Sequence, residues 1–431
     1  MKYFVNTFGC QMNMADSEEM GRHLAERGFT QTTAASDADW ILVNTCTVRQ
    51  HAENRAASYL GRLRPWREKH PHRRLIVTGC AAQRLQKKLR TKFSHVDLVV
   101  GARDIDLFPK KIDSLLAGPE ERNLARSTGI PADSKTTGFV TIMRGCNYAC
   151  SYCIVPSVRG REISRAPREI LDEIRLKASR GIREFMLLGQ TVNSYRFTES
   201  RGAVTDFAEL LRAIDREPGV ERLRFMSPHP SHVTDRMIRA MAECRTVCEH
   251  LHLPVQSGSD AVLKRMRRGY TSRSIIELTD RLRKAIPSLS ITTDVLVGFP
   301  GETEEDFEET LRLLDAMGLD GAYCFKYSAR PGTPAAEEND PVPAETIEDR
   351  HARVLKHAEE LALGKRTALV GTDQQVSIDA VDDSFYEGRT RSHWKVRWPA
   401  TVAGEPGSFM NVRITGFNNL TLRGEPCMRN S

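Results

Sequence analysis

The stretch from residue 144 to residue 165 reads Arg-Gly-Cys-Asn-Tyr-Ala-Cys-Ser-Tyr-Cys-Ile-Val-Pro-Ser-Val-Arg-Gly-Arg-Glu-Ile-Ser-Arg and holds three cysteines spaced C-x3-C-x2-C. This tight spacing lets one loop surround a small inorganic core. A cubane iron–sulfur cluster normally takes four thiolates, whereas Cys146, Cys150 and Cys153 supply three, with no obvious fourth in the loop. One iron would keep an open position, as a metal site that binds a reactant requires.

A structural zinc knuckle is the alternative for this loop. Zinc sites usually close with four ligands in C-x2-C pairs, and the neighbouring residues offer neither a histidine nor a second such pair. We therefore favour the cluster. The loop resembles the signature of the radical S-adenosylmethionine (SAM) enzymes, in which the open iron binds the amino and carboxylate groups of SAM. Tyr152 matches the aromatic residue that packs near the adenine in that superfamily.

Composition describes an ordinary globular chain of 431 residues, with 40% apolar and 28% charged residues, long enough for two or three domains. No stretch approaches the roughly 20 apolar residues of a membrane helix, and the N-terminus lacks the apolar core of a signal peptide. We expect a cytoplasmic protein that binds no membrane. Thiols stay reduced there, so ten cysteines suggest metal or redox chemistry, and the net charge of +7 permits a polyanionic partner.

Residues 1–116 alternate between apolar runs and helical patterns, which predicts a doubly wound parallel sheet. The expected strands cover residues 3–5, 40–43, 75–77 and 97–100. The first helix is expected over about residues 17–27, with Asp16 and Glu19 placed like a capping box.

A second set of three cysteines falls in this predicted domain. Cys10, Cys46 and Cys80 each come just after the carboxyl end of an expected strand. In an open parallel sheet that edge binds ligands, because loops from neighbouring strands converge there. Two of the three follow a glycine, which allows a backbone to approach a cofactor closely. The three thiols could hold a second cluster with one open iron. The alternative is three unrelated buried thiols.

Residues 117–137 have no apolar period and predict a linker. From 137 to 365 the alternation resumes, with strands expected at 139–143, 185–188, 223–226, 250–253, 291–297 and 322–327. Six strand–helix units fit an incomplete α/β barrel. The cysteine loop follows its first strand, at the carboxyl face where such barrels hold their active sites.

Other candidate ligand-binding residues follow later strands of the predicted barrel. The polar ones are Gln190, Asn193, Gln256 and Ser257, and Gly298 would let a backbone approach a ligand closely. Each alone is more typical of a capped turn, but their joint position at strand ends favours SAM binding. We expect packing roles for the remaining cysteines and structural roles for the unpatterned histidines: Cys244, Cys248, Cys324, Cys427, His229, His232, His250 and His252.

Residues 366–431 change to short strands, expected at 375–381, 386–389, 395–398, 411–417 and 420–423, which predicts a small β-barrel of the oligonucleotide-binding type. One segment of it mixes bases with a tryptophan and contains no acid. Phosphate contacts and base stacking would suit looped RNA, whereas the alternative is a solvated basic strand. The candidate RNA-binding residues are Arg389, Arg391, Trp394, Lys395 and Arg397.

Nearly the whole sequence resembles one family, the radical SAM methylthiotransferases, whose members combine a three-cysteine domain, a radical SAM barrel and a C-terminal TRAM domain. The order of the predicted domains, 1–116, 137–365 and 366–431, matches theirs. The motifs resemble the branch that acts on isopentenyladenosine in tRNA, and Gln11-Met12 departs from the branch that acts on threonylcarbamoyladenosine. The matching motifs are Gly9–Asn13, Asn44–Arg49, Arg144–Asn147, Leu251–Ser259 and Tyr327–Pro334.

The resemblance implies that Cys10, Cys46 and Cys80 hold an auxiliary [4Fe-4S] cluster, while the loop cysteines hold the SAM cluster. It implies methylthiolation at C2 of N6-isopentenyladenosine at position 37, next to the anticodon. The expected partners of a monomeric enzyme are a tRNA anticodon stem-loop, a one-electron reductant and a sulfur source. The alternatives are methylthiolation of threonylcarbamoyladenosine or of a ribosomal protein aspartate, and a cluster-containing RNA-binding redox sensor.

Overall fold

The computed structural model describes residues 1–48, 50–117, 136–382 and 384–427. It divides the chain into two compact units. The first comprises Met1–Asp133, Arg144–Tyr148 and Ile154–Ile163, and the second comprises Ser134–Met143, Ala149–Cys153 and Ser164–Ser431. The chain therefore changes unit three times between residues 144 and 165. Most of the predicted linker, residues 118–135, lies outside the described residues.

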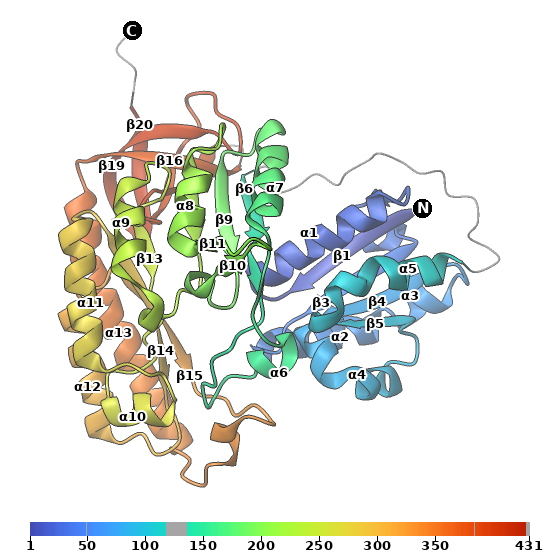
Figure 1. The fold of residues 1–431 in the computed structure, drawn as a ribbon, viewed down its shortest axis with the longest axis horizontal. Coiled ribbons are helices and arrows are strands. Elements are labelled where there is room, and N and C mark those ends of the chain that lie inside the picture. Colours follow the sequence, from blue (N-terminus) through green and yellow to red (C-terminus); the bar gives the residue numbers. More distant parts are fainter. Residues whose placement is uncertain (49, 118–135, 383, 428–431) are drawn as a thin grey trace. The chain divides into compact units, whose positions relative to one another are not determined.

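The first unit contains a five-stranded sheet in the order β2-β1-β3-β4-β5, and all of its pairings are parallel (Figure 1). The doubly wound sheet expected from the sequence is confirmed. Its strands are β1 (Lys2–Phe8), β2 (Thr30–Gln31), β3 (Trp40–Thr45), β4 (Arg74–Gly79) and β5 (Leu98–Gly101), and its helices are α1 (Gln11–Ala25), α2 (Gln50–Arg62), α3 (Arg64–Glu68), α4 (Cys80–Lys92), α5 (Phe108–Leu116) and the short α6 (Val155–Arg159).

Alternate residues of β3 belong to two different apolar clusters, because side chains of a strand point to opposite faces. Ile41 and Val43 pack with residues of α2 and α4, whereas Trp40 and Leu42 pack with residues of α1 and α5. Both faces of the sheet are thus covered by helices, and its central strands β3 and β4 are buried along nearly their whole length, as expected for a parallel sheet. This arrangement leaves the carboxyl edge of the sheet for the cysteines.

The second unit contains six parallel strands that run in sequence order from β6 to β15. They form two three-stranded sheets, which are linked where Leu223 pairs with Val247. The expected incomplete barrel is confirmed. Its strands are β6 (Thr137–Thr141), β9 (Glu184–Leu188), β12 (Arg222–Phe225), β13 (His250–His252), β14 (Ser290–Val297) and β15 (Gly321–Lys326).

Helices follow these strands and cover them from outside (Figure 1). Several of them begin with side-chain caps: Thr303 and Asp306 form a capping box at the start of α12, and Asp206 and Glu209 form one at the start of α8. The helices are α7 (Pro167–Ser179), α8 (Phe207–Asp215), α9 (Asp235–Glu243), α10 (Asp260–Arg265), α11 (Ser272–Ala285), α12 (Glu304–Met317) and α13 (Ala344–Leu369). The short strands outside the main sheets are β7 (Met143–Arg144), β8 (Ile163–Ser164), β10 (Arg196–Thr198) and β11 (Val204–Asp206).

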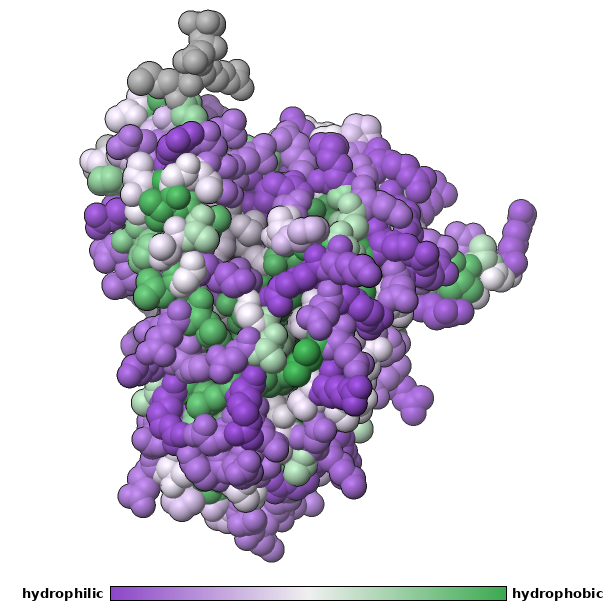
Figure 2. All heavy atoms as spheres, turned by 90° about the vertical axis from the view of Figure 1, so that its left-hand side faces the viewer, coloured by the Kyte–Doolittle hydropathy of each residue, from purple (hydrophilic) through white to green (hydrophobic). Residues whose placement is uncertain are grey.

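The outer surface is mostly hydrophilic on the face seen in Figure 2, with smaller apolar patches between the charged side chains. Helices such as α11 bury one side only, with Ile275, Leu278 and Leu282 inside. Among the described residues, no helix is both long and apolar enough to cross a bilayer.

The C-terminal strands close into the predicted small barrel, in the order β16-β17-β18-β20-β19. Its centre is filled by apolar side chains that include Trp398, Ile378 and Val412. Helix α13 continues to Leu369, which packs against this centre, so the domain boundary expected at residue 365 falls inside a helix. The strands are β16 (Asp373–Val381), β17 (Phe385–Thr390), β18 (Lys395–Pro399), β19 (Phe409–Asn418) and β20 (Thr421–Pro426).

Candidate iron–sulfur and SAM site

The first three cysteines follow three adjacent strands of the parallel sheet. Cys46 comes directly after β3 and Cys80 directly after β4, while Cys10 lies two residues beyond the end of β1. The strands are in register here, with Phe8 opposite Thr45 and Thr45 opposite Gly79. The thiols lie close enough to interact: the pKa of Cys80 is raised to about 11, mainly by burial and against the lowering effect of Arg159, with smaller raising contributions from Cys46 and Cys10. The structure thus brings this trio together, as the sequence predicted.

Local hydrogen bonds fix the loops that carry this trio. The Asn13 Nδ2 donates to the Oδ1 of Asn44 at 2.9 Å, and the Asn44 Nδ2 donates to the carbonyl of Asn13 at 2.8 Å. Gly79 has a φ of +97°, and a Cβ there would lie 2.3 Å from the carbonyl oxygen of Thr45. Only glycine therefore lets α4 start at Cys80 so close to β3.

The donor set of the trio fits a cubane cluster, since three thiols converge at the ligand-binding edge of the sheet. No three His, Cys, Asp or Glu side chains in the described part of the chain are arranged to hold a single metal ion. A cubane differs in this respect, because each thiolate binds a different iron atom and the ligands stand further apart.

The capping box expected at Asp16 and Glu19 is wrong. Helix α1 begins at Gln11, with Cys10 as its N-cap, so Asp16 lies inside the helix and is buried. Its carboxylate binds the guanidinium groups of Arg144 and Arg159, and Arg144 also binds Glu19 at 2.6 Å. Burial would raise the pKa of Asp16, but Arg159 and Arg144 outweigh it and hold the pKa below its ordinary value. A local pattern could not show this network, because its partners are more than a hundred residues apart.

The loop with the second cysteine trio is divided between the two units. In the first unit, Gly145 has a φ of +83° and the Cys146 N–H donates to the carbonyl of Gly160 at 3.0 Å. In the second unit, the Cys153 N–H donates to the carbonyl of Cys150 at 3.1 Å. Tyr152 packs against an apolar cluster that includes Met266 and Phe299, and burial raises its pKa well above its ordinary value.

Arg268 is a residue of this site that the sequence analysis missed. Its Nη1 donates to the Sγ of Cys150 at 3.2 Å, its Nη2 donates to the carbonyl of Pro254 at 3.1 Å, and its Nε donates to the hydroxyl of Tyr270 at 2.7 Å. The guanidinium is 6% exposed. This hydrogen bond fixes the position of the Cys150 sulfur. A single arginine among many gave no signal for this role.

The predicted SAM-binding residues all follow carboxyl ends of barrel strands, but several side chains have partners within the protein. The Asn193 amide donates to the carbonyl of His229 at 2.9 Å and accepts from its N–H at 2.8 Å. The Ser257 hydroxyl is buried 3.3 Å from that of Thr310. Gln190 and Gln256 are partly exposed, and Gln256 has a φ of +71°. Their contacts with SAM remain predictions.

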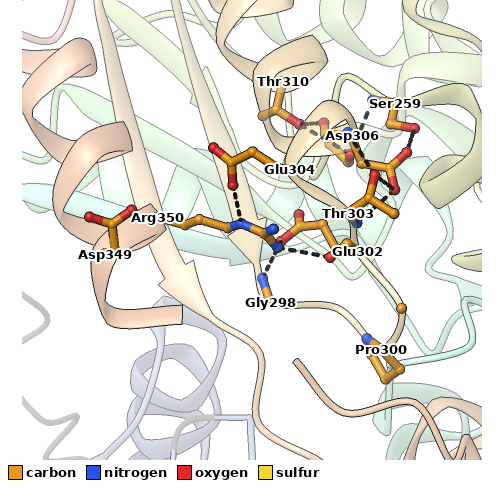
Figure 3. A network of polar contacts seen from close by, with 12 residues as sticks. Ser259, Gly298, Pro300, Glu302, Thr303, Glu304, Asp306, Thr310, Asp349 and Arg350 are labelled. Atoms are coloured by element: carbon orange, nitrogen blue, oxygen red, sulfur yellow. Dashed lines mark hydrogen bonds and ion pairs between the residues drawn. The ribbon is translucent and has the colours of Figure 1, made fainter. Parts of the chain in front are cut away.

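The loop after β14 is held by a buried ion pair (Figure 3). The Glu302 carboxylate accepts from the Gly298 N–H at 2.7 Å and from Arg350 of α13 at 3.0 Å. Burial raises the pKa of Glu302, against the lowering effects of the Gly298 N–H and Arg350. A Cβ on Gly298 would lie 2.5 Å from the Ile347 side chain, so glycine is needed here for the approach of α13.

The predicted RNA-binding residues occupy two different settings on the C-terminal barrel. Arg391 binds both carboxylate oxygens of Glu249, at 2.7 and 2.8 Å, and the carbonyls of Arg245 and Val247. It is thus part of the seam between the two barrels. The remaining residues lie on the small barrel itself: Arg389, Lys395 and Arg397, which are partly exposed and pair with Asp379, Glu387 and Asp382, and Trp394, which packs against the barrel centre.

The remaining cysteines and histidines behave largely as packing residues. Cys244 and Cys248 are buried, and His250 and His252 both lie 3.0 Å from the Thr292 hydroxyl. The His229 N–H and carbonyl hold Asn193.

Comparison with known proteins gives two family matches. Residues 140–314 match the radical SAM superfamily, and residues 2–101 match the uncharacterized protein family UPF0004. A solved structure of the radical SAM methyltransferase TsrM from Kitasatospora setae is similar with a TM-score of 0.57 and 14% identity, over 78% of this chain and 77% of that one. That likeness concerns the fold.

Curated relatives extend over nearly the whole chain. A tRNA-2-methylthio-N(6)-dimethylallyladenosine synthase of Acetivibrio thermocellus is 40% identical over 98% of this chain and 90% of its own length. The enzymes of the same name from Clostridium novyi and Endomicrobium trichonymphae are also 40% identical, over 98% and 92% of this chain and 96% and 93% of their own lengths. This chain therefore belongs to the radical SAM superfamily and, within it, to the family of the tRNA-2-methylthio-N(6)-dimethylallyladenosine synthases.

Proposed function

We propose that this protein methylthiolates C2 of N6-isopentenyladenosine at position 37 of tRNA, next to the anticodon, to give 2-methylthio-N6-isopentenyladenosine. The observation that carries the proposal is the gathering of Cys10, Cys46 and Cys80 at the carboxyl edge of a parallel sheet, in a chain 40% identical to such synthases. The domains are 1–116 for the auxiliary cluster, 137–365 for SAM and 366–431 for RNA.

Two [4Fe-4S] clusters and SAM are the cofactors of the proposed reaction. Cys146, Cys150 and Cys153 would hold one cluster, which with SAM would supply the radical that an aromatic C–H bond requires, and the first trio would hold the other, at which the sulfur to be transferred would be bound. The protein's own residues aim these groups. Arg268 orients Cys150, and Tyr152 together with the strand-end residues holds SAM.

The substrate base has to leave its stack to reach such a site. The partly exposed arginines and lysine of the C-terminal barrel, Arg389, Lys395 and Arg397, would bind phosphates of the anticodon stem-loop after exchanging their carboxylate partners. We further propose that the enzyme is a cytoplasmic monomer that receives single electrons from a reductant and sulfur from a separate donor.

The test uses anaerobically reconstituted full-length protein, SAM, a strong reductant and tRNA that carries isopentenyladenosine. Cys150→Ala should abolish formation of 5′-deoxyadenosine. Cys46→Ala should retain it and yield no methylthio product, because the radical source remains intact. If Cys46→Ala gave the same product as the parent, the auxiliary site would be misassigned.

Substrate controls separate the alternatives. Transfer to threonylcarbamoyladenosine tRNA or to a ribosomal protein aspartate, with none to isopentenyladenosine, would contradict the proposal. Binding of tRNA without any cleavage of SAM would favour a redox sensor.

A further inference from the structure

Part of the SAM motif packs inside the three-cysteine unit. Residues Arg144–Tyr148 and Ile154–Ile163 belong to the same compact unit as the parallel sheet. Helix α6 and the residue before it contribute Val158 and Ile154 to a small apolar cluster that contains Cys80. Arg103 fastens the same helix by donating to the carbonyls of Pro156 and Ser157, at 3.2 and 2.6 Å. The helix therefore covers one ligand of the first trio.

Arg159, the last residue of α6, lies beside this trio with its side chain only 4% exposed. Its Nη2 donates to the Oδ2 of Asp16 at 2.9 Å. The guanidinium lowers the pKa of the Cys80 thiol, which opposes the effect of burial. Burial lowers the pKa of Arg159 itself, but Asp16 first and then Cys80 and Cys10 raise it more strongly, so the group stays charged.

One nitrogen of this guanidinium lacks a partner. The Nη1 of Arg159 is buried and has no partner at ordinary hydrogen-bond geometry among the described residues, while the guanidinium lies close enough to the Cys80 thiol to interact with it. A buried donor without an acceptor destabilises a fold, so such a group calls for an explanation. The neighbours that share its surroundings are the sulfurs of Cys80 and Cys10. An anionic sulfur ligand at the trio would supply the missing acceptor.

We propose that Arg159 is a positioning residue for the auxiliary cluster, and that its Nη1 donates a hydrogen bond to a sulfur of that cluster. This inference depends on the cluster assignment in the proposed function. Hydrogen bonds to cluster sulfurs and nearby positive charge favour the reduced, more negative form of a cluster. Arg159 therefore raises the reduction potential of the auxiliary cluster and strengthens its retention. Asp16 holds the guanidinium in place, and Arg144 completes the support for Asp16.

The experiment uses the full-length chain with Cys146, Cys150 and Cys153 changed to alanine, so that a cluster can form only on the first trio. We would measure the iron and sulfide content of this parent and of Arg159→Met. We would also measure the midpoint potential of the cluster in both, using electron paramagnetic resonance to detect its reduction. We expect Arg159→Met to shift the midpoint to a more negative potential and to lose iron faster to a chelator, with Arg159→Lys between the two.

Arg103→Met is the matched control, because it removes an arginine that contacts α6 while Arg159 stays held by Asp16; its midpoint should equal that of the parent. An unchanged midpoint and iron content in Arg159→Met would overturn the proposal. If Arg159→Met failed to fold, the double variant Arg159→Met with Asp16→Asn would replace it, because this variant leaves no unpaired carboxylate at residue 16. A midpoint equal to that of the parent in the double variant would also overturn the proposal.

The failure of the proposed function has a different signature. If the parent itself bound no iron, the trio would not be a cluster site and the cluster assignment would fall with it. A parent that holds a cluster with a midpoint insensitive to residue 159 rejects the role of Arg159 alone.

Discussion

Arg350 and Glu302 illustrate how a single buried pair can hold a loop near the SAM-binding end of the barrel. Their side chains are 5% and 1% exposed, and their charged atoms lie 3.0 Å apart. Removing one member of such a pair leaves the other charge buried without compensation, which costs about 3–5 kcal/mol. The Glu302 carboxylate would still accept the hydrogen bond from the Gly298 N–H, so the unpaired charge would destabilise the loop after β14.

We therefore expect Arg350→Met to lower the thermal unfolding midpoint markedly, as measured by circular dichroism on the apoprotein. Arg350→Met combined with Glu302→Gln should recover most of the loss, because the amide no longer needs a counter-charge. Arg353→Met is the control, since that side chain is 38% exposed and its ion pairs are worth at most about 1 kcal/mol. Equal losses for Arg350→Met and Arg353→Met would contradict this account.

Single residues also show where sequence reasoning reaches its limit. The six cysteines proposed to hold the clusters could be selected from the sequence, because each trio has either a tight spacing or a fixed place after strands. Arg159 and Arg268 could not be selected, since their partners are far away in the chain and nothing local distinguishes them from other arginines. The capping-box prediction for Asp16 is wrong for the same reason: Glu19 follows it at the spacing of a capping box, whereas the partners of Asp16 come from the cysteine loop.

At the scale of elements, the junction between β4 and α4 controls the position of Cys80. The helix begins at the cysteine itself, and Gly79 before it takes a conformation with φ +97° that other residues rarely adopt. Any side chain at this position would also collide with the carbonyl of Thr45.

Gly79→Ala should therefore displace the start of α4 and reduce the iron bound at the first trio, measured after reconstitution of a chain that lacks the loop cysteines. Gly61→Ala in α2 is the control: no atom lies within 4 Å of the added Cβ, and alanine should stabilise this helix by about 0.5–1 kcal/mol. Full iron content in Gly79→Ala would show that the junction tolerates the change.

The elements themselves were largely predictable. Most expected strands of the two sheets begin and end within a few residues of the observed ones, because apolar runs bounded by turn residues leave little choice of period. The orientation of side chains was harder to predict from the sequence. Asn193 and Ser257 follow strand ends as expected, but their polar atoms are used by the His229 backbone and by Thr310, a matter of tertiary packing that no spacing reveals.

At the scale of the whole molecule, the seam between the SAM barrel and the C-terminal barrel is buried and charged. Arg224 donates to the carbonyls of Arg391 and Thr390, at 2.7 and 2.8 Å, and to Glu184 at 3.0 Å. His250 and His393 stack with ring centroids 4.6 Å apart. One end of the segment predicted to bind RNA, at Thr390 and Arg391, therefore packs against the SAM barrel. Its other basic residues, Arg389, Lys395 and Arg397, remain at the surface.

The seam should make stability depend on pH. Burial, first, and then neighbouring positive groups lower the pKa of both His250 and His393 well below the ordinary value of 6.5. The unfolded chain then binds more protons than the folded one as pH falls below about 6.5, so stability is full above that pH and is lost progressively below it. The groups facing the pair include Arg224, Arg389 and His252.

We expect the thermal midpoint to fall between pH 7.5 and pH 5, and His393→Asn to weaken this dependence. Asparagine is the suitable replacement because His393 has a φ of +72°, which asparagine tolerates. A replacement of the exposed His72 should leave the dependence unchanged. Identical pH profiles for the parent and His393→Asn would exclude a role for the stacked pair.

The passage of the cysteine loop through both compact units has a consequence for biosynthesis. A nascent chain released from the ribosome up to residue 116 would contain Cys10, Cys46 and Cys80 but would lack Arg159 and the helix that covers Cys80. Translation has to proceed through Ile163 before every segment of the N-terminal unit has been synthesised. Iron delivered before that point would meet an incomplete binding site, which favours cluster loading after Ile163 has emerged from the ribosome.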